Sequence, residues 1–288
     1  MTTTPALAWL GDSQGQGCWG SPDHLALPLR DRGLLLADGL FETVLVEADQ
    51  AWLLEDHLGR WQHSAELLGL PLPPGAAIVN PLASEAIRRS GIRSGALRLN
   101  WSRGGGAGDC RGIDLTGNDE PRFWLQLSAI EPCFAPVRVI VSPTETRSAT
   151  SLLSRCKTFA YGPSIQARRQ ARAAGADDSL LASSAGGLCC GTTANLLVCR
   201  DGGWLTPPLA SGCLPGVMRQ RALERGLVAE APVGEQDLLS GEGAWLINSL
   251  SCRPISHLGV APLARHRWQP ESFWRQLLQP PIQQPGPH

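Results

Sequence analysis

The chain has 288 residues, a formal net charge of −1, and 43% hydrophobic against 18% charged residues. This balance is typical of a packed globular protein, and a mass of 30.8 kDa leaves room for one large or two ordinary domains; we expect two. A net charge near zero gives no electrostatic reason to expect binding to nucleic acid or to an anionic membrane. The expected partner is therefore a small molecule.

The cysteine pattern indicates a reducing compartment. Nine scattered cysteines, an odd number, and the absence of a basic-then-apolar leader fit free thiols in the cytoplasm. No CxxC pair is present, so no metal is expected. The longest apolar runs are far shorter than the roughly 20 residues that span a bilayer, which excludes a membrane helix from our expectation.

The N-terminal half begins with a strand pattern and then changes to a helix pattern. Residues 41–48 alternate in polarity and are rich in Val and Thr, which predicts a strand with 52–54 as its hairpin partner. Over 55–68, apolar residues recur at three- and four-residue steps, which predicts an amphipathic helix. Asn80 followed by Pro81 predicts a further helix start, since a cap and a proline in the first turn are both favoured there.

The rest of the chain mixes both kinds of element. Further helices are predicted over 164–174 and 216–225, and further strands over 96–102, 123–130, 137–142, 179–182, 195–200 and 244–248. The predicted domains are a smaller N-terminal α+β domain over 1–130, a proline-containing connection over 131–136, a larger C-terminal domain over 137–279, and a disordered tail over 280–288.

One residue type is almost missing from the chain. Lys157 is the only lysine among 25 basic residues, and all the others are arginines. Arginine replaces lysine in solubility and salt bridges, but its guanidinium stays protonated and cannot act as an amine nucleophile. A chemical role that requires a primary amine is Schiff-base formation with a carbonyl, typically the aldehyde of pyridoxal phosphate. Lys157 is therefore the first candidate for a catalytic residue.

Four separated segments resemble the fold-type IV pyridoxal-phosphate enzymes. This family includes branched-chain aminotransferases, D-amino-acid transaminases and 4-amino-4-deoxychorismate lyases, and the resemblance covers roughly residues 30–260. Residues 32–43 look like the family's entry strand, and His57, Arg60 and Ser64 match its H-x-x-R-x-x-x-S helix. Residues 154–161 resemble the segment that carries the family's lysine, here Lys157.

The resemblance implies a set of cofactor contacts. Arg60 is expected to hold the cofactor phosphate, for which a planar guanidinium is suited. Residues 214–219 resemble the phosphate-binding turn, where the backbone N–H groups of Val217 and Met218 at a helix start face the anion and Leu214 packs on the pyridine ring. Residues 248–250 resemble the N-S-L loop of the lyase branch, which implies phosphate contacts from Ser249 and Leu250.

Other residues are candidates for substrate contacts. Tyr161, the only tyrosine, lies four residues after Lys157 and is expected near the cofactor's phenolic oxygen or the substrate, with an ordinary core role as the alternative. Arg98 and Arg103 are candidates for binding substrate carboxylates, with a structural role as the alternative for each, and Phe41 is expected to line the substrate site.

One position departs from the family pattern. The segment 186–196 matches the stretch that leads into the family's Asn-Leu strand, and the glutamate expected beside the pyridine nitrogen falls on Cys190. A thiol supplies little of the stabilisation that a carboxylate gives to the protonated ring. Transamination depends on that stabilisation, whereas loss of pyruvate from aminodeoxychorismate is also driven by formation of an aromatic ring.

The combined prediction is a two-domain α+β, fold-type IV (D-amino-acid aminotransferase-like) enzyme that binds pyridoxal 5'-phosphate and assembles as a homodimer. The expected activity is that of a 4-amino-4-deoxychorismate lyase, which forms 4-aminobenzoate and pyruvate for folate synthesis. Two alternatives stay open: an aminotransferase for branched-chain or D-amino acids, and a weakly active or non-catalytic relative, which the replacement at Cys190 motivates.

Overall fold

The computed structural model describes residues 6–105, 113–115, 117 and 120–280. The chain divides into two compact units: the first contains residues 1–132 and 151–161, and the second contains residues 133–150 and 162–288. The short segment that carries Lys157 groups with the first unit, although the boundary expected from the sequence placed it in the C-terminal domain. The glycine-rich residues 106–112 and nearly all of the expected tail, residues 281–288, lie outside the described residues.

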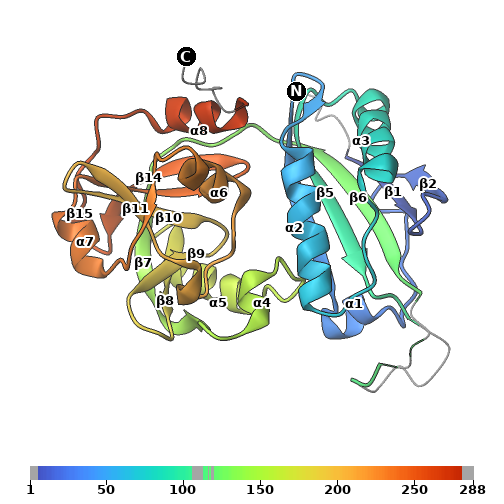
Figure 1. Ribbon diagram of the computed structural model, residues 1–288, viewed down its shortest axis with the longest axis horizontal. Coiled ribbons are helices and arrows are strands. Elements are labelled where there is room, and N and C mark those ends of the chain that lie inside the picture. The colour runs from blue at the N-terminus through green and yellow to red at the C-terminus, as the bar shows by residue number, and fades with distance from the viewer. Residues whose placement is uncertain (1–5, 106–112, 116, 118–119, 281–288) are drawn as a thin grey trace, which may run out of the picture. The chain divides into compact units, whose positions relative to one another are not determined.

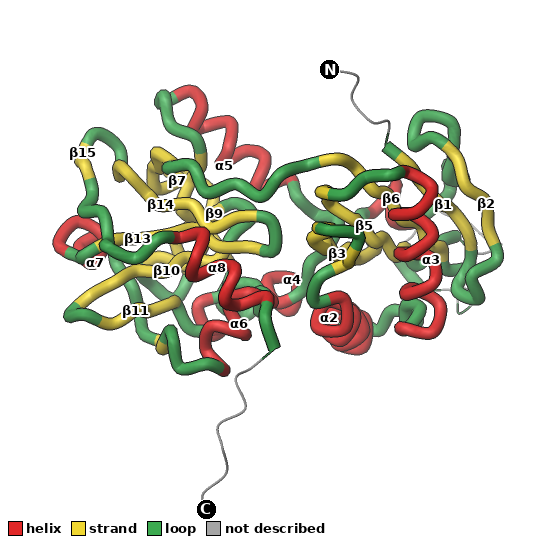
Figure 2. The backbone as a smooth tube through the Cα atoms, turned by 90° about the horizontal axis from the view of Figure 1, so that it is seen from above, coloured by secondary structure: helices red, strands yellow, loops and turns green. Residues whose placement is uncertain are grey.

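The first unit is built on a six-stranded antiparallel sheet, whose strands follow the order β2-β1-β6-β5-β3-β4. Figure 2 shows this order from β2 to β3. The strands are β1 (Leu7–Gly11), β2 (Gly17–Gly20), β3 (Gly39–Glu47), β4 (Gln50–Ala51), β5 (Ser94–Ser102) and β6 (Arg122–Ala129). The helices are α1 (Arg32–Leu36), α2 (Leu54–Leu67), α3 (Ala76–Ser90) and α4 (Leu152–Arg155).

One face of this sheet carries the apolar core. Alternate residues of a strand point to the same face, and the residues Leu97, Leu99 and Trp101 of β5 form one cluster with the buried sides of α2 and α3. Both helices lie over this face (Figure 1). The opposite set of side chains, which includes Phe41 and Arg98, is thereby directed to the other face of the sheet.

Three expectations about local structure in the first unit were wrong. The hairpin partner of β3 is β4 (Gln50–Ala51), not residues 52–54, because α2 already begins at Leu54. Residues 32–43 do not form one entry strand: Asp31 caps a short helix, α1, by accepting a hydrogen bond from the Gly33 N–H at 2.9 Å, and β3 begins only at Gly39. The next helix, α3, begins at Ala76 rather than at Asn80, and Pro81 lies inside it. Pro81 is exposed, so it costs one helical hydrogen bond without disturbing the core.

The second unit contains a closed sheet. Its strands follow the order β12-β11-β10-β13-β14-β7-β8-β9, and β9 also pairs with β10, so the strands from β10 to β9 form a ring. The strands are β7 (Val137–Arg147), β8 (Asp178–Ser183), β9 (Leu188–Gly191), β10 (Asn195–Arg200), β11 (Gly203–Thr206), β12 (Ala229–Glu230), β13 (Gly243–Asn248), β14 (Ser251–Leu258) and β15 (Ala261–Pro262).

The helices of the second unit surround this barrel. They are α5 (Gly162–Ala173), α6 (Val217–Glu224), α7 (Glu235–Ser240) and α8 (Pro270–Leu278), with a 3-10 turn over Leu209–Ser211. Aliphatic side chains from β7, β8, β10, β13 and β14 form the barrel's core. This mixed α+β organisation agrees with the fold class expected from the sequence.

Candidate active site

Lys157 lies in a short extended segment that pairs with the beginning of β3. The Phe41 N–H donates to the Lys157 carbonyl at 2.9 Å, and the Phe159 N–H donates to the Gly39 carbonyl at 3.1 Å. A Cβ at Gly39 would stand 2.3 Å from the Phe159 ring, so only glycine permits this close approach. The backbone of the single lysine is therefore fixed against the sheet.

The Lys157 amine is surrounded by the aromatic and polar side chains on this side of the sheet. Its Nζ donates to the Tyr161 hydroxyl at 3.1 Å and lies 4.3 Å from the centroid of the Phe41 ring. The Arg98 guanidinium carbon lies 3.6 Å from the same centroid, and Arg98 Nε donates to Asn100 Oδ1 at 2.7 Å. Phe41 therefore brings together an amine and a guanidinium, two groups suited to an anionic substrate.

A second polar group lies between β3 and α2. The Glu42 carboxylate is 1% exposed and accepts hydrogen bonds from Arg60 Nε at 2.8 Å, from Arg60 Nη2 at 2.5 Å and from His57 Nδ1 at 2.7 Å. The sequence reasoning singled out Arg60 and His57 but not Glu42. The signal that was missed is the position of this carboxylate in β3, where Glu42 lies on the same buried face as Leu40 and Val44.

Arg103 has a different environment from Arg98. Its guanidinium is almost fully buried and donates to Asp38 Oδ2 at 2.9 Å and to the Gly69 carbonyl at 3.0 Å. These bonds join the end of β5 to the turns that precede β3 and follow α2. Of the two roles expected for Arg103, this arrangement supports the structural one.

The second unit brings together the segments that carry its candidate cofactor residues. Asn195 pairs with Cys190 across β9 and β10, and its Nδ2 donates to the Leu214 carbonyl at 2.9 Å. A Cβ at Gly216 would stand only 2.0 Å from Asn195 Oδ1. Asn195, which was not among the candidate residues, is thus the connection between the Cys190 strand and the turn before α6.

The turn before α6 has the form of an anion-binding helix start. Gly216 is the N-cap residue, and the first backbone bond of the helix runs from the Gln220 N–H to the Gly216 carbonyl. The N–H groups of Val217 and Met218 precede this bond, so they have no carbonyl acceptor within the helix. Because the glycine has no side chain and the helix dipole is positive here, the residues present fit a phosphate group.

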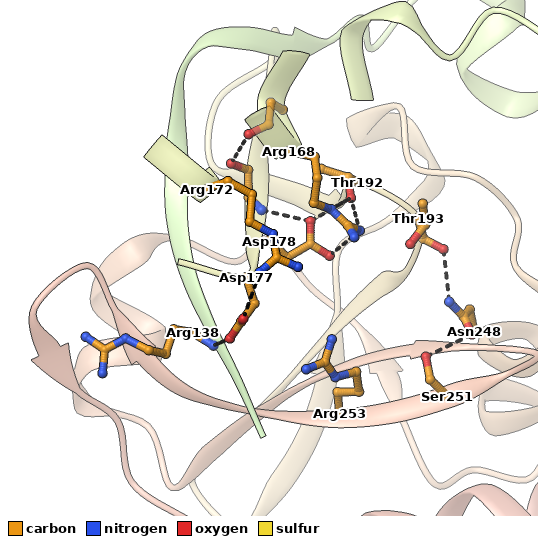
Figure 3. A network of polar contacts seen from close by, with 12 residues as sticks. Arg138, Arg168, Arg172, Asp177, Asp178, Thr192, Thr193, Asn248, Ser251 and Arg253 are labelled. Carbon is orange, nitrogen blue, oxygen red and sulfur yellow. Dashed lines mark hydrogen bonds and ion pairs between the residues drawn. The ribbon is translucent and has the colours of Figure 1, made fainter. Parts of the chain in front are cut away.

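Ser249 and Leu250 form the tight turn between β13 and β14. Asn248 Oδ1 accepts hydrogen bonds from the Leu250 N–H at 2.8 Å and from the Ser251 hydroxyl at 3.0 Å. The Asn248 Nδ2 group donates to the Thr193 carbonyl at 3.3 Å, which joins this turn to the one after β9 (Figure 3). The second unit therefore gathers three of the segments expected to contact the cofactor.

Cys190 is buried in a cluster of small apolar side chains and thiols. It packs with Ala167, Leu181, Cys189 and Cys213. The thiol–thiol hydrogen bond with Cys190, together with burial, raises the pKa of Cys189 to about 12. The Cys189 thiol is therefore in its neutral form at physiological pH, and the cluster is a weakly polar environment.

An ion pair supports the turn that follows Cys190. Arg168 on α5 donates to the Thr192 hydroxyl at 2.6 Å and to Asp178 Oδ2 at 2.9 Å, while Asp178 Oδ1 accepts from the Thr192 hydroxyl at 2.6 Å (Figure 3). Both the carboxylate and the hydroxyl group belong to buried residues. Their complete pairing fixes the β9–β10 turn against β8.

One cluster elsewhere in the described residues resembles a metal-ligand set. Cys199, Glu242 and His266 each offer a ligand atom within 4.8 Å of the others. However, Glu242 Oε1 already accepts from the Gly202 N–H at 2.7 Å, and His266 Nδ1 accepts from the Trp268 N–H at 3.0 Å. Burial also raises the pKa of the Cys199 thiol. These contacts account for the cluster as local packing.

Comparisons with known proteins show which family this chain is similar to. Residues 39–258 match the family model for amino-transferase class IV. A Methanocaldococcus jannaschii protein assigned as a branched-chain-amino-acid aminotransferase is 27% identical, and the alignment covers 75% of this chain and 76% of the relative. A bifunctional aminodeoxychorismate lyase and D-amino acid transaminase of Mycobacterium tuberculosis is 28% identical over 79% of this chain and 83% of its own.

A solved structure has a similar fold. A Legionella pneumophila protein described as a 4-amino-4-deoxychorismate lyase superposes with a TM-score of 0.80 at 25% identity, covering 89% of this chain and 96% of its own. Among the described residues, no helix is long and apolar enough to cross a membrane. The chain belongs to the class IV amino-transferase family of pyridoxal-phosphate enzymes.

Proposed function

We propose that the protein is a pyridoxal-phosphate-dependent 4-amino-4-deoxychorismate lyase, which forms 4-aminobenzoate and pyruvate. The observation that carries this proposal is the environment of Cys190, the residue that stands where the family resemblance places a glutamate. Cys190 packs among apolar side chains and thiols, and a thiol is a weaker hydrogen-bonding partner for a pyridine nitrogen than a carboxylate is. A reaction that gains an aromatic ring depends less on that partner than transamination does.

The names of the relatives are consistent with a lyase, but they include aminotransferases as well. The Legionella protein is described as a lyase, and the Mycobacterium protein combines a lyase with a D-amino acid transaminase. The Methanocaldococcus relative is assigned as a branched-chain-amino-acid aminotransferase. The aminotransferase is therefore the second candidate function.

The residues of the first unit supply the proposed proton chemistry. When bound, pyridoxal phosphate supplies an aldehyde for amine capture and a ring that withdraws electrons from the amine-bearing carbon. Lys157 Nζ would hold the cofactor, and its free amine would remove the proton from the amine-bearing carbon of the substrate. As the ether C–O bond breaks, the enolpyruvyl group takes up a proton and leaves as pyruvate.

Neighbouring side chains orient this amine and the substrate. The Tyr161 hydroxyl, 3.1 Å from Nζ, accepts a hydrogen bond from the amine and limits its rotation. Arg98 packs on Phe41 and directs its Nε to Asn100, which orients the planar guanidinium for a substrate carboxylate. For the cofactor phosphate, we propose Arg60, the N–H groups of Val217 and Met218, and the turn containing Ser249 and Leu250.

The proposal is tested by product formation from enzymatically generated aminodeoxychorismate. The native chain should release 4-aminobenzoate and pyruvate in equal amounts, and Lys157→Ala should release neither. Arg155→Ala, which changes an exposed basic residue two positions away, is the matched control and should keep the activity. Product from Lys157→Ala at the native rate would remove Lys157 from the mechanism.

The two alternatives have their own measurements. An aminotransferase converts its bound cofactor to the amine form when an amino acid is added without a keto acid, and this conversion is visible in the absorbance spectrum. A non-catalytic relative would bind the cofactor but catalyse neither the lyase reaction nor transamination. The homodimer and the cytoplasmic location expected from the sequence are also proposals; sedimentation of the loaded protein tests the first and fractionation of cells tests the second.

A further inference from the structure

A carboxylate is buried in the core of the first unit. Glu42 lies on the face of β3 that packs against α2, in phase with the core residues Leu40 and Val44, and is 1% exposed. Moving a charge into such a position is costly unless it is paired and hydrogen-bonded. The chain meets this condition with two residues of one helix, His57 and Arg60, which are three positions apart and therefore share a face of α2.

The contacts of Glu42 fix the plane of the Arg60 guanidinium. Its two oxygens accept from Nε at 2.8 Å and from Nη2 at 2.5 Å, a two-point pair that uses one edge of the planar group. His57 Nδ1 lies 2.7 Å from the oxygen that also faces Nη2. These bonds fix Nε and Nη2 of a side chain that has four rotatable bonds.

The protonation states are consistent with this geometry. Burial alone would raise the pKa of Glu42, but the Arg60 charge and the hydrogen bonds from His57 and Arg60 lower it to about 2. Burial also lowers the pKa of His57, so the ring is neutral at pH 7 and its Nδ1–H donates to the carboxylate. The cluster then holds one negative and one positive charge.

Stability alone does not account for such a cluster. Replacing a buried ion pair by apolar residues of similar volume is often neutral or stabilising, and the surrounding core of Leu40, Val44, Leu58 and Trp61 offers an apolar site. The ion pair supplies instead a fixed orientation for a cation. A site that binds an anion stabilises its charge most when the hydrogen-bond donors are already oriented before the anion binds.

We propose that Glu42 and His57 are positioning residues, which hold the Arg60 guanidinium in the orientation that binds the cofactor phosphate. This inference rests on the proposed role of Arg60 in phosphate binding. Glu42 contributes geometry rather than charge, because its own charge opposes that of the phosphate. Two opposite results are therefore distinguishable: loss of Glu42 weakens phosphate binding if it positions Arg60 and strengthens it if it only neutralises Arg60.

The test compares pyridoxal phosphate with pyridoxal, which lacks the phosphate, as ligands of the full-length apoprotein. Dissociation constants are measured by equilibrium dialysis, so no turnover is required. For Glu42→Gln, the constant for pyridoxal phosphate should rise about 10-fold or more, while that for pyridoxal should stay within about twofold. Arg60→Ala should remove the preference for pyridoxal phosphate over pyridoxal. The double variant, Glu42→Gln with Arg60→Ala, should lose no more of this preference than Arg60→Ala alone.

Two further variants keep the test decisive if Glu42→Gln fails to fold. His57→Gln retains a side-chain donor for Glu42 and should preserve the preference for pyridoxal phosphate, whereas His57→Phe should reduce it. Glu85→Gln is the matched control, because Glu85 also accepts from two arginines, Arg88 and Arg89, on the surface of α3. This control should behave as the native chain.

Three results would overturn the proposal. Equal losses for both ligands would assign Glu42 to folding alone, and tighter or unchanged binding of pyridoxal phosphate to Glu42→Gln would assign it to charge neutralisation. Retention of the full preference by Arg60→Ala would remove the phosphate role of Arg60 and the positioning role together. The lyase reaction would still be judged separately, by product formation that depends on Lys157.

Discussion

Glu42 should make the stability of the protein depend on acid pH. Its pKa is about 2 in the folded chain against 4.5 for an ordinary glutamate, and this difference corresponds to about 3 kcal/mol of folding free energy at pH 7. Because the folded pKa is the lower one, this contribution is complete above pH 4.5 and is lost as the pH falls towards 2. Glu42→Gln removes the titrating group and leaves the side-chain size almost unchanged.

The assay is urea denaturation of the apoprotein and of Glu42→Gln at several pH values, followed by tryptophan fluorescence. The difference in the free energy of unfolding between the two proteins should shrink by roughly 2 kcal/mol between pH 6 and pH 3. Taking the difference cancels the carboxylates that both proteins share. A difference that stays constant over this range, or grows as the pH falls, would refute the ionised and paired state of Glu42.

Three further substitutions test other parts of the site. Gly216→Ala places a Cβ 2.0 Å from Asn195 Oδ1 and should weaken pyridoxal phosphate binding at least 10-fold in a dialysis titration. A dissociation constant equal to that of the native chain would contradict this prediction. Tyr161→Phe removes the hydroxyl that Lys157 Nζ contacts, so the turnover rate should fall at least 10-fold with an unchanged circular dichroism spectrum. Cys190→Glu restores the glutamate that the family resemblance places at this position and should speed conversion of the cofactor to its amine form by an amino acid; no change would remove Cys190 as the reason for preferring the lyase.

The sequence was sufficient for the elements with a clear period. The helix predicted over 55–68 is α2 (Leu54–Leu67), and the strand predicted over 195–200 is β10 (Asn195–Arg200). Both have one buried side or a continuous apolar run that local pattern reading detects. The start of α3 was missed because the buried residues Val79 and Ala83 carry the helix through Pro81, which is a tertiary effect.

Two other elements were missed for different reasons. Strand β14 contains Pro254, which argues against a strand in a local reading, yet it pairs with β13 and β7 inside the ring. Helix α8 was also absent from the prediction, although Gln269 followed by Pro270 and the apolar residues Phe273 and Leu277 gave a usable signal.

In the candidate site too, some residues could be predicted from the sequence, whereas their contacts could not. Lys157 was singled out by being the only lysine, and its neighbour Tyr161 by being the only tyrosine. The pairing of Arg60 with Glu42 was not predicted, because it depends on which side of β3 packs against α2. The packing of Arg98 on Phe41 likewise requires the register between β3 and β5.

The central claim is tested most directly by the conversion of enzymatically generated aminodeoxychorismate by the native chain loaded with pyridoxal phosphate. The account predicts 4-aminobenzoate and pyruvate in a one-to-one ratio, with both products lost in Lys157→Ala and retained in Arg155→Ala. Folded, cofactor-loaded protein that forms neither product, but converts its cofactor to the amine form with an amino acid, would contradict the lyase and establish an aminotransferase.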